Sequence, residues 1–117
     1  VLLGGSSVNA CLPLALQSHG KKVLTVKWFG CREIPHPLQV SFVKHGAIQC
    51  GFCTAGMIVS AKGLLDKEPH PTRQQIKEAI SGNLCRCTGY KKIVEAIEDA
   101  AVKMNSLSES SRLSKAK

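Results

Sequence analysis

Four cysteines stand in two tight pairs, and their spacing is the strongest chemical signal in the chain. Cys50 and Cys53 are separated by two residues, and Cys85 and Cys87 by one. Each pair sits among glycine, threonine and asparagine residues, just ahead of a run in which apolar residues recur with helical spacing. A helix N-terminus favours negative charge and lowers the pKa of a nearby thiol. Four thiolates that converge from two helix starts would bind a metal centre.

Three kinds of site are compatible with this spacing. Zinc takes four tetrahedral ligands, commonly from two C-x2-C pairs about 15–20 residues apart, whereas this chain has one C-x-C pair and a longer separation. A [2Fe–2S] cluster takes four thiolates, two on each iron, although the plant-type C-x4-C-x2-C spacing is absent. Reduced cysteines in a helical core, or a disulfide, form the third interpretation. The pattern favours iron–sulfur over zinc and leaves all three open.

Composition and charge narrow the class of protein. The chain has 117 residues, enough for one compact domain or two very small ones, and 44% are hydrophobic but only 4% aromatic. This mixture favours helices packed through aliphatic side chains. The net charge is +8, but the basic residues are scattered and few aromatics could stack on bases, so a solvated surface is favoured over nucleic-acid binding.

The cysteines also bear on location. No apolar run approaches the ~18–20 residues that span a bilayer, and no basic leader precedes the first apolar residues. We therefore expect a reducing, cytoplasmic environment. In such a compartment clustered cysteines favour metal binding or redox chemistry over structural disulfides.

The N-terminal segment 1–30 has the features of a small mixed unit. A strand is predicted over residues 1–3 and a turn over 4–7. A short helix is predicted from about residue 9 to 20, and a second strand over 22–26. A unit this short could not be stable alone.

Helical spacing dominates the remainder. A linker rich in proline and glycine covers residues 28–37. Thr72 and Gln75 form a capping box, and Pro37 fits the first turn of an earlier helix. The polar, serine-rich tail from 105 to 117 is predicted to be disordered. The predicted helices span 37–46, 51–67, 72–82 and 90–104.

Two longer motifs enclose the cysteines. QCGFCTAGM, from Gln49 to Met57, and GNLCRCTGY, from Gly82 to Tyr90, closely resemble the signatures of the helical [2Fe–2S] domain in the xanthine oxidase/aldehyde oxidoreductase family of molybdenum hydroxylases. HPLQVSFVKHGAIQCGFC, which starts at His36, is similar to the helix that leads into the first cysteine pair in that family. The resemblance covers about residues 1–104.

The resemblance implies a mainly α fold. A four-helix-bundle [2Fe–2S]-binding domain is expected over residues 31–104. The remnant of a β-grasp, ferredoxin-like domain is expected before it, over 1–30, and the disordered tail after it, over 105–117.

The resemblance also implies roles for residues. Cys50, Cys53, Cys85 and Cys87 would be the cluster ligands, and Gln49 and Cys87 match the positions that touch the pterin of a molybdopterin cofactor. Electrons would pass from molybdopterin to this cluster, then to a second [2Fe–2S] cluster and on to FAD or another acceptor. The expected partners are a molybdopterin-binding large subunit, where the substrate chemistry occurs, and an FAD-binding subunit. This chain would be a non-catalytic subunit of the complex. The alternative from another functional class is a small zinc-stabilised interaction module.

The chain departs from the family pattern in two places. Cys11 matches the fourth ligand of the ferredoxin-like cluster, but the other three ligands have no counterpart, so we expect one cluster in this chain and a start inside that domain. Ala55 stands where the family usually has proline, and alanine suits an early helix position. Cys31, in the linker, is expected to be a free thiol.

Overall fold

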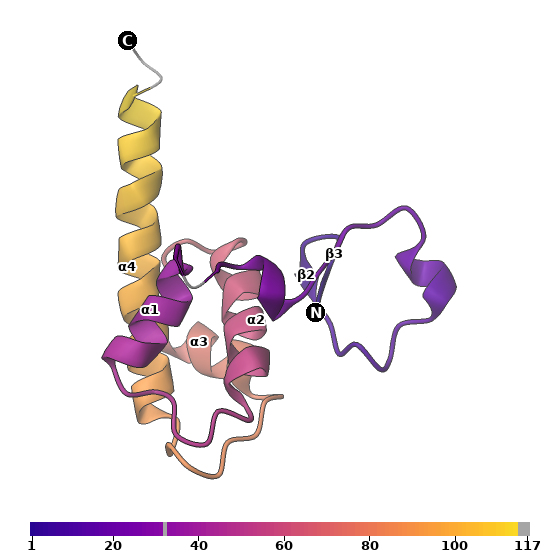
Figure 1. Cartoon of the computed structure of the whole chain (residues 1–117), viewed down its shortest axis with the longest axis horizontal. Helices are drawn as coiled ribbons and strands as arrows, with labels where there is room; N and C mark the ends of the chain where they lie inside the picture. Colours follow the sequence, from indigo (N-terminus) through magenta and orange to yellow (C-terminus); the bar gives the residue numbers. More distant parts are fainter. Residues whose placement is uncertain (32, 115–117) are drawn as a thin grey trace.

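The computed structural model describes residues 1–31 and 33–114, and in these ranges the chain is mostly helical with one small sheet (Figure 1). The longest helix, α4, runs along the molecule, and the other three helices surround its N-terminal half (Figure 1). The sheet lies beyond α2, on the side away from α4. The elements in chain order are β1 (Leu2–Leu3), β2 (Ser6–Ser7), the 3-10 turn η1 (Ala15–Ser18), β3 (Val23–Leu24), the 3-10 turn η2 (Val26–Trp28), α1 (Pro37–Lys44), α2 (Thr54–Leu65), α3 (Arg73–Ile80) and α4 (Lys91–Ser114).

The starts of α1 and α3 are fixed by local side chains. His36 caps α1: its ring Nδ1 accepts the backbone N–H two residues ahead at 3.2 Å, and the Gln39 side chain accepts the His36 N–H at 2.8 Å. Pro37 occupies the first turn. Thr72 and Gln75 exchange the same pair of bonds at the start of α3, at 3.3 and 2.7 Å. Both predicted helix starts are therefore confirmed, and reciprocal capping explains them.

The core lies between the four helices. The most extensive packing is between α1 and α4, while α2 and α3 close the other side. Burial of aliphatic side chains contributes about 25 cal/mol for each Å² removed from water, so this core is the main source of stability. The largest core side chains are at most 2% exposed: Leu38, Phe42, Met57, Ile76, Ile80, Ile93 and Ile97.

The sheet depends on α2 for its position. Its strand order is β2-β1-β3, with β1 antiparallel to both neighbours, so that Leu2 pairs with Ser7 and with Leu24. Leu2 is 2% exposed. A Cβ atom on Gly63 in α2 would lie 3.2 Å from Leu2 Cδ2 and 3.0 Å from Ser7 Cβ. The glycine therefore allows the sheet to approach the helix closely.

Three predictions for the segment 1–30 need correction. The turn predicted over 4–7 is limited to Gly4 and Gly5, because Ser6 and Ser7 pair with β1 as strand β2. The helix predicted from about residue 9 to 20 is wrong, because the structure has only the 3-10 turn Ala15–Ser18 there. The predicted strand over 22–26 shortens to Val23–Leu24. Short helices need an apolar face packed against a neighbour, and three leucines of this segment find none. They are 68–88% exposed: Leu12, Leu14 and Leu16.

The end of α4 also differs from the prediction. The sequence suggested an end at about Met104 and a disordered tail, whereas α4 continues to Ser114 (Figure 1). The segment from 105 to 114 contains neither glycine nor proline, so nothing in it stops a helix. The end of the predicted tail, 115–117, lies outside the described residues. Within the described part of the chain, no helix has the length and apolar character needed to cross a membrane.

Candidate metal centre

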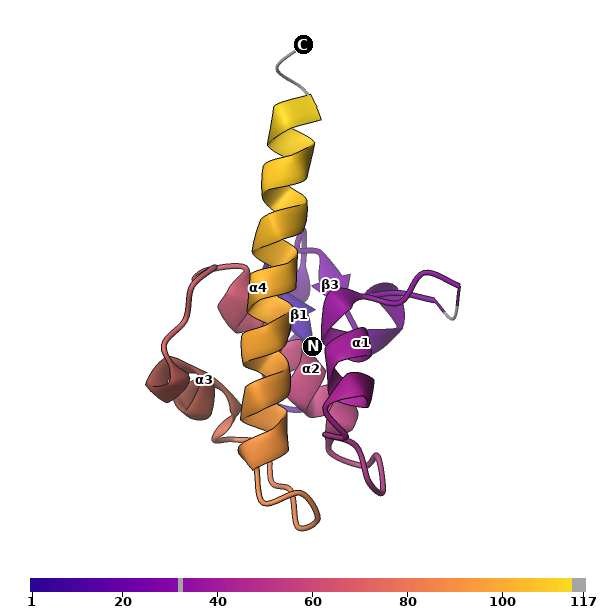
Figure 2. The ribbon, with the colours of Figure 1, turned by 90° about the vertical axis from the view of Figure 1, so that its left-hand side faces the viewer.

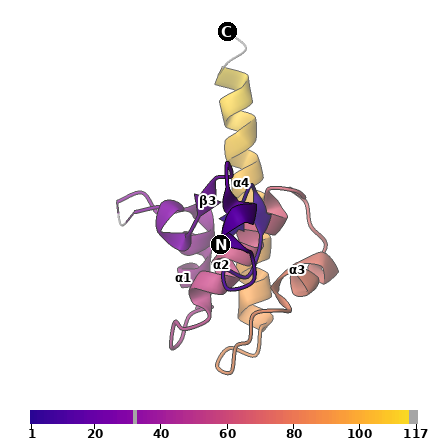
Figure 3. The ribbon, with the colours of Figure 1, turned by 90° about the vertical axis from the view of Figure 1, so that its right-hand side faces the viewer.

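The two cysteine motifs lie in two loops at the same end of the molecule. The loop 45–53 joins α1 to α2, and the loop 81–90 joins α3 to α4. Figures 2 and 3 show these loops side by side, at the end opposite the C-terminus. Gly46 and Gly51 adopt left-handed φ angles of 60° and 84°, which allow the first loop to turn sharply.

Helix α1 is held against α4 just before the first loop. The Asp99 carboxylate of α4 accepts hydrogen bonds from Ser41 Oγ at 2.7 Å and Lys103 Nζ at 2.6 Å, and Lys44 Nζ lies 3.7 Å away. These partners, with Lys103 first, hold the pKa of Asp99 well below its usual range. Ser41 is fully buried. This polar contact fixes the end of α1, from which the first cysteine loop begins.

The four thiols meet crosswise, one from each motif in each contact. Cys87 Sγ lies 3.6 Å from Cys50 Sγ, and the Cys53 thiol interacts with the Cys85 thiol. Two sulfurs bound to one tetrahedral metal at about 2.3 Å lie about 3.8 Å apart, so the first contact has the spacing of a metal-binding pair. Among the described residues, no three His, Cys, Asp or Glu side chains group around a single-ion site. The thiols thus meet two by two.

The two contacts differ in their surroundings. Cys53 and Cys85 pack against the core, whereas Cys50 and Cys87 are exposed. Burial, and secondly the contact with Cys85, raises the pKa of the Cys53 thiol to about 11. The Thr88 hydroxyl, 3.2 Å from Cys85 Sγ, lowers the pKa of Cys85 to about 7. The contact with Cys50 raises the pKa of Cys87. Two neighbouring thiolates repel each other, so a cation bound between them would favour the ionised form of both.

The second loop has an unusual backbone. Gly89 and Tyr90 both adopt left-handed φ angles, 63° and 66°, which is uncommon for a bulky residue such as tyrosine. The Tyr90 hydroxyl accepts the Cys85 N–H at 2.8 Å and donates to the Asn83 carbonyl at 3.3 Å. Thr88 Oγ1 accepts the Tyr90 N–H at 3.3 Å. The φ angle of Asn83 in the same loop is not positive.

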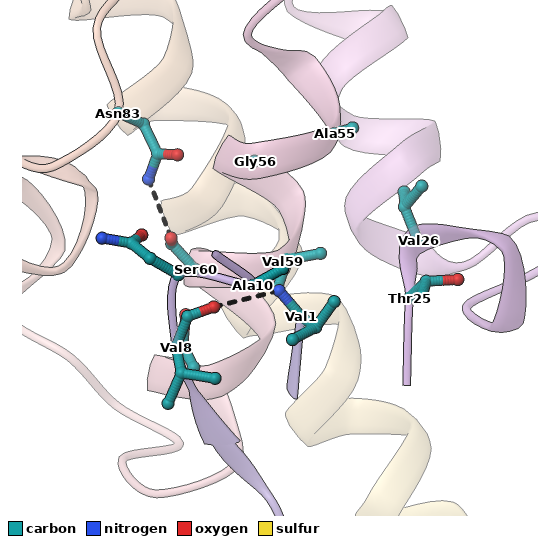
Figure 4. A pocket seen from close by; sticks show the side chains of 12 residues that line it. Val1, Val8, Ala10, Thr25, Val26, Ala55, Gly56, Val59, Ser60 and Asn83 are labelled. Atoms are coloured by element: carbon teal, nitrogen blue, oxygen red, sulfur yellow. Dashed lines mark hydrogen bonds between the residues drawn. The ribbon is translucent and has the colours of Figure 1, made fainter. Parts of the chain in front are cut away.

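Asn83 acts instead through its side chain. Its Nδ2 donates to Ser60 Oγ of α2 at 2.8 Å, and a Cβ atom on Gly56 would lie 2.5 Å from Asn83 Oδ1. Figure 4 shows this bond beside a cavity of about 280 Å³ between the sheet and α2. The second cysteine loop is therefore fastened to the helix that follows the first. Sequence reasoning missed this contact. The one feature of the sequence that pointed to it is a polar residue, Ser60, inside the apolar run of α2.

The remaining predicted residues also have clear positions. Gln49 is exposed and directly precedes Cys50. Cys53 is the N-cap residue of α2, which agrees with the prediction that the first pair stands at a helix start. Cys11 and Cys31 are exposed free thiols in the segment before α1.

The chain has relatives of known type. The sequence model of the [2Fe–2S] binding domain family matches residues 25–98. The nicotine 6-hydroxylase small subunit of Paenarthrobacter nicotinovorans is 50% identical over 100 residues, which cover 86% of this chain and 60% of the relative.

Solved structures agree with this match. Quinoline 2-oxidoreductase from Pseudomonas putida 86 superposes with a TM-score of 0.78 at 48% identity, covering 86% of this chain and 62% of that one. Aldehyde oxidoreductase from Desulfovibrio gigas gives a TM-score of 0.85 at 44% identity, covering 89% and 12%.

The chain thus spans about 60% of the length of its small-subunit relative and a much smaller part of the aldehyde oxidoreductase. The matched segment contains both cysteine motifs and the whole of α1, α2 and α3. The resemblance inferred from the motifs is confirmed: the chain belongs to the [2Fe–2S] binding domain family, with relatives among the molybdenum hydroxylases.

Proposed function

We propose that this chain binds one [2Fe–2S] cluster and is the electron-transfer component of a molybdenum hydroxylase. Cys50 and Cys87 would hold one iron, and Cys53 and Cys85 the other. The observation that carries the proposal is the crosswise meeting of the thiols, with 3.6 Å between Cys50 Sγ and Cys87 Sγ. This arrangement suits a centre in which each iron takes two thiolates.

A bound cluster would supply a one-electron site between molybdopterin in a large partner subunit and a second [2Fe–2S] cluster, with FAD or another acceptor beyond it. The chain itself sets the surroundings of the sulfurs. Cys53 and Cys85 lie against the core, and the Thr88 hydroxyl bonds to Cys85 Sγ. Burial and hydrogen bonds to sulfur are two of the properties that tune the potential of such centres.

The exposed side of the site supports a docking role. Cys50 and Cys87 are exposed, as is Gln49 beside them, so we propose that Gln49 and Cys87 contact the pterin. Phe52 and Leu84, which adjoin cysteines of the two loops, are 94% and 83% exposed. Large apolar side chains in such positions fit burial against another subunit. We propose a molybdopterin-binding large subunit as this partner and an FAD-binding subunit as a further member of the complex.

We also propose a division of the chain into a four-helix-bundle domain over residues 31–104, part of a β-grasp ferredoxin-like domain over 1–30, and a tail over 105–117. The core supports this division, because it is built from α1, α2, α3 and α4. In residues 1–31, Leu2 is the one fully buried hydrophobic residue.

Metal analysis of the anaerobically purified chain tests the cluster. We expect two irons per chain, as in any [2Fe–2S] centre, and a red-brown chromophore that dithionite bleaches. A colourless protein with stoichiometric zinc would contradict the proposal and support a zinc-stabilised module. Cys87→Ser should lower the iron content, while the matched variant Cys11→Ser should keep it. Iron loss in Cys11→Ser would contradict this assignment of the cysteines.

The pairing can be tested separately by electron paramagnetic resonance of the reduced cluster in serine variants. Cys50→Ser and Cys87→Ser alter ligands of the same proposed iron, so their spectra should resemble each other. Cys53→Ser and Cys85→Ser should form a second matching group. Spectra that group by motif, with Cys50→Ser like Cys53→Ser, would contradict the crosswise pairing.

A further inference from the structure

A second cavity lies between α3 and the start of α4, apart from the thiols. Its volume is about 490 Å³, within the range of cavities that hold small organic ligands. Neither the proposed cluster ligands nor Gln49 line it. The lining comes from the two helices and the turn before α4, and it includes Arg73, Lys77, Ile80, Tyr90, Lys91 and Val94.

The charge of this lining is entirely positive. Arg73, Lys77 and Lys91 are cationic, and no carboxylate lines the cavity. Arg73 is partly neutralised by Glu98, whose carboxylate oxygen lies 3.2 Å from Arg73 Nη1. Among the described side chains, Lys77 and Lys91 form no ion pair. The cavity therefore holds two uncompensated positive charges.

The start of α4 adds to this imbalance. No acidic residue occupies its first turn, and Lys91 and Lys92 stand there instead. The N-terminus of a helix carries a partial positive charge, so lysines at this position are unfavourable. A negative group bound between Lys77 and Lys91 would relieve the repulsion. Ser81 also lines the cavity, but its hydroxyl donates its proton to the Glu78 carbonyl at 2.7 Å, so the two lysines are the groups that would bind the anion.

The floor of the cavity is apolar. Ile80 and Val94 line it and are each 2% exposed, and Tyr90 lines it as well. An inorganic ion would leave the apolar part of the lining without a partner, whereas an organic anion would pack against it. We propose that the cavity between α3 and α4 binds a small organic anion, with its carboxylate or phosphate between Lys77 and Lys91 and its apolar body on Ile80 and Val94. This proposal does not depend on the bound cluster.

Isothermal titration calorimetry of the full chain tests the proposal with three probes. They are 4-phenylbutyrate, its neutral analogue 4-phenylbutyramide, and inorganic phosphate. We expect one molecule of 4-phenylbutyrate to bind per chain, with the amide and phosphate each at least tenfold weaker. Higher salt should weaken binding of the acid, because salt screens exposed charges.

Charge variants locate the site. Lys77→Gln and Lys91→Gln should each weaken 4-phenylbutyrate binding about tenfold. Lys67→Gln removes an exposed lysine that also lacks an ion pair among the described side chains and lies outside the cavity, so it should bind as the parent chain does. Circular dichroism establishes that all three variants remain folded.

Both the comparison of probes and the comparison of variants can contradict the proposal. Equal affinity for the acid and the amide, undetectable binding of the acid, or identical behaviour of Lys77→Gln, Lys91→Gln and Lys67→Gln would overturn the anion site. Phosphate binding as tightly as the acid would overturn the role of the apolar floor. Iron content is measured on the same samples, so failure of the cluster proposal remains distinguishable from failure of this one.

Discussion

The helical part of the chain and the N-terminal segment before it both contain hydrophobic residues, but they bury them to very different extents. In the helices, residues such as Phe42 and Ile97 are fully buried, because helical spacing gathers them on one face of each helix. In the N-terminal segment, Leu2 is buried but Leu12, Leu14 and Leu16 are 68–88% exposed. Hydrophobic residues alone therefore do not make a core. They need an element whose period brings them to one side and a neighbour to cover it.

The largest expected effect contrasts these two regions directly. Phe42→Ala, in α1, should lower the free energy of unfolding by about 3–5 kcal/mol, since it leaves a cavity in the core. Leu16→Ala, at a position 88% exposed, should change it by less than about 0.5 kcal/mol. Denaturant unfolding measures both. Similar losses in the two variants would contradict the contrast.

A smaller effect is expected where the second cysteine loop meets α2. Gly56→Ala places a Cβ atom 2.5 Å from Asn83 Oδ1 and should break the bond from Asn83 to Ser60. We expect the displaced hydrogen-bonded side chain to cost about 1–2 kcal/mol, partly offset by the preference of a helix for alanine over glycine of about 1 kcal/mol. Amide exchange in the loop 81–90 should become faster. Gly82→Ala is the matched control, because no heavy atom lies within 4 Å of its new Cβ. Equal exchange rates in the two variants would show that this contact does not hold the loop.

Gly63→Ala should stabilise the helical part of the chain and loosen the N-terminal segment. Alanine favours a helix over glycine by about 1 kcal/mol, so α2 itself gains stability. The new methyl group would crowd Leu2 and Ser7, at 3.2 and 3.0 Å, and should push the sheet away. Limited proteolysis should then cut residues 1–30 faster while the helical part stays resistant. Unchanged cleavage of the N-terminal segment would mean that the sheet does not depend on this close approach.

The smallest expected effect concerns pH. Burial, and secondly the charge of Lys62, lowers the pKa of His36 in the folded chain. An unfolded histidine has a pKa of about 6.5, so below that pH the unfolded chain binds more protons than the folded chain. The contribution of neutral His36 is thus complete above about pH 6.5 and is lost as the pH falls through the lowered pKa.

His36→Asn keeps a side chain that caps helices well but does not titrate in this range. Urea unfolding at pH 7, 6 and 5 should show the parent chain losing stability relative to the variant as the pH falls. Parallel pH profiles for the two proteins would contradict the assignment to His36.

Sequence reasoning predicted the helices best where local signals agreed. His36, Pro37, Thr72 and Gln75 lie at helix starts whose capping bonds involve residues two or three positions apart, so their chemistry is visible without tertiary knowledge. The predicted helix from about residue 9 to 20 failed because its outcome depended on a missing packing partner. Local propensity cannot report whether such a partner exists.

The candidate site likewise has features that local sequence predicts and features that depend on tertiary packing. The sequence indicated which four cysteines could form a centre, since their spacing is local within each motif. It could not indicate that Cys50 meets Cys87, because that contact joins residues 37 positions apart and depends on how four helices pack. The anchoring of Asn83 on Ser60, 23 positions away, was hidden for the same reason.

The crosswise meeting of the thiols has a consequence for the order of events during synthesis. Under the proposed pairing, each iron takes one thiol from each motif, so neither motif alone would supply both thiolates of one iron. Cys50 and Cys53, which are synthesised first, would then stay without metal until α3 and the turn after it have been made. Cluster insertion would then be a late step, possible only in chains whose helices have already packed together.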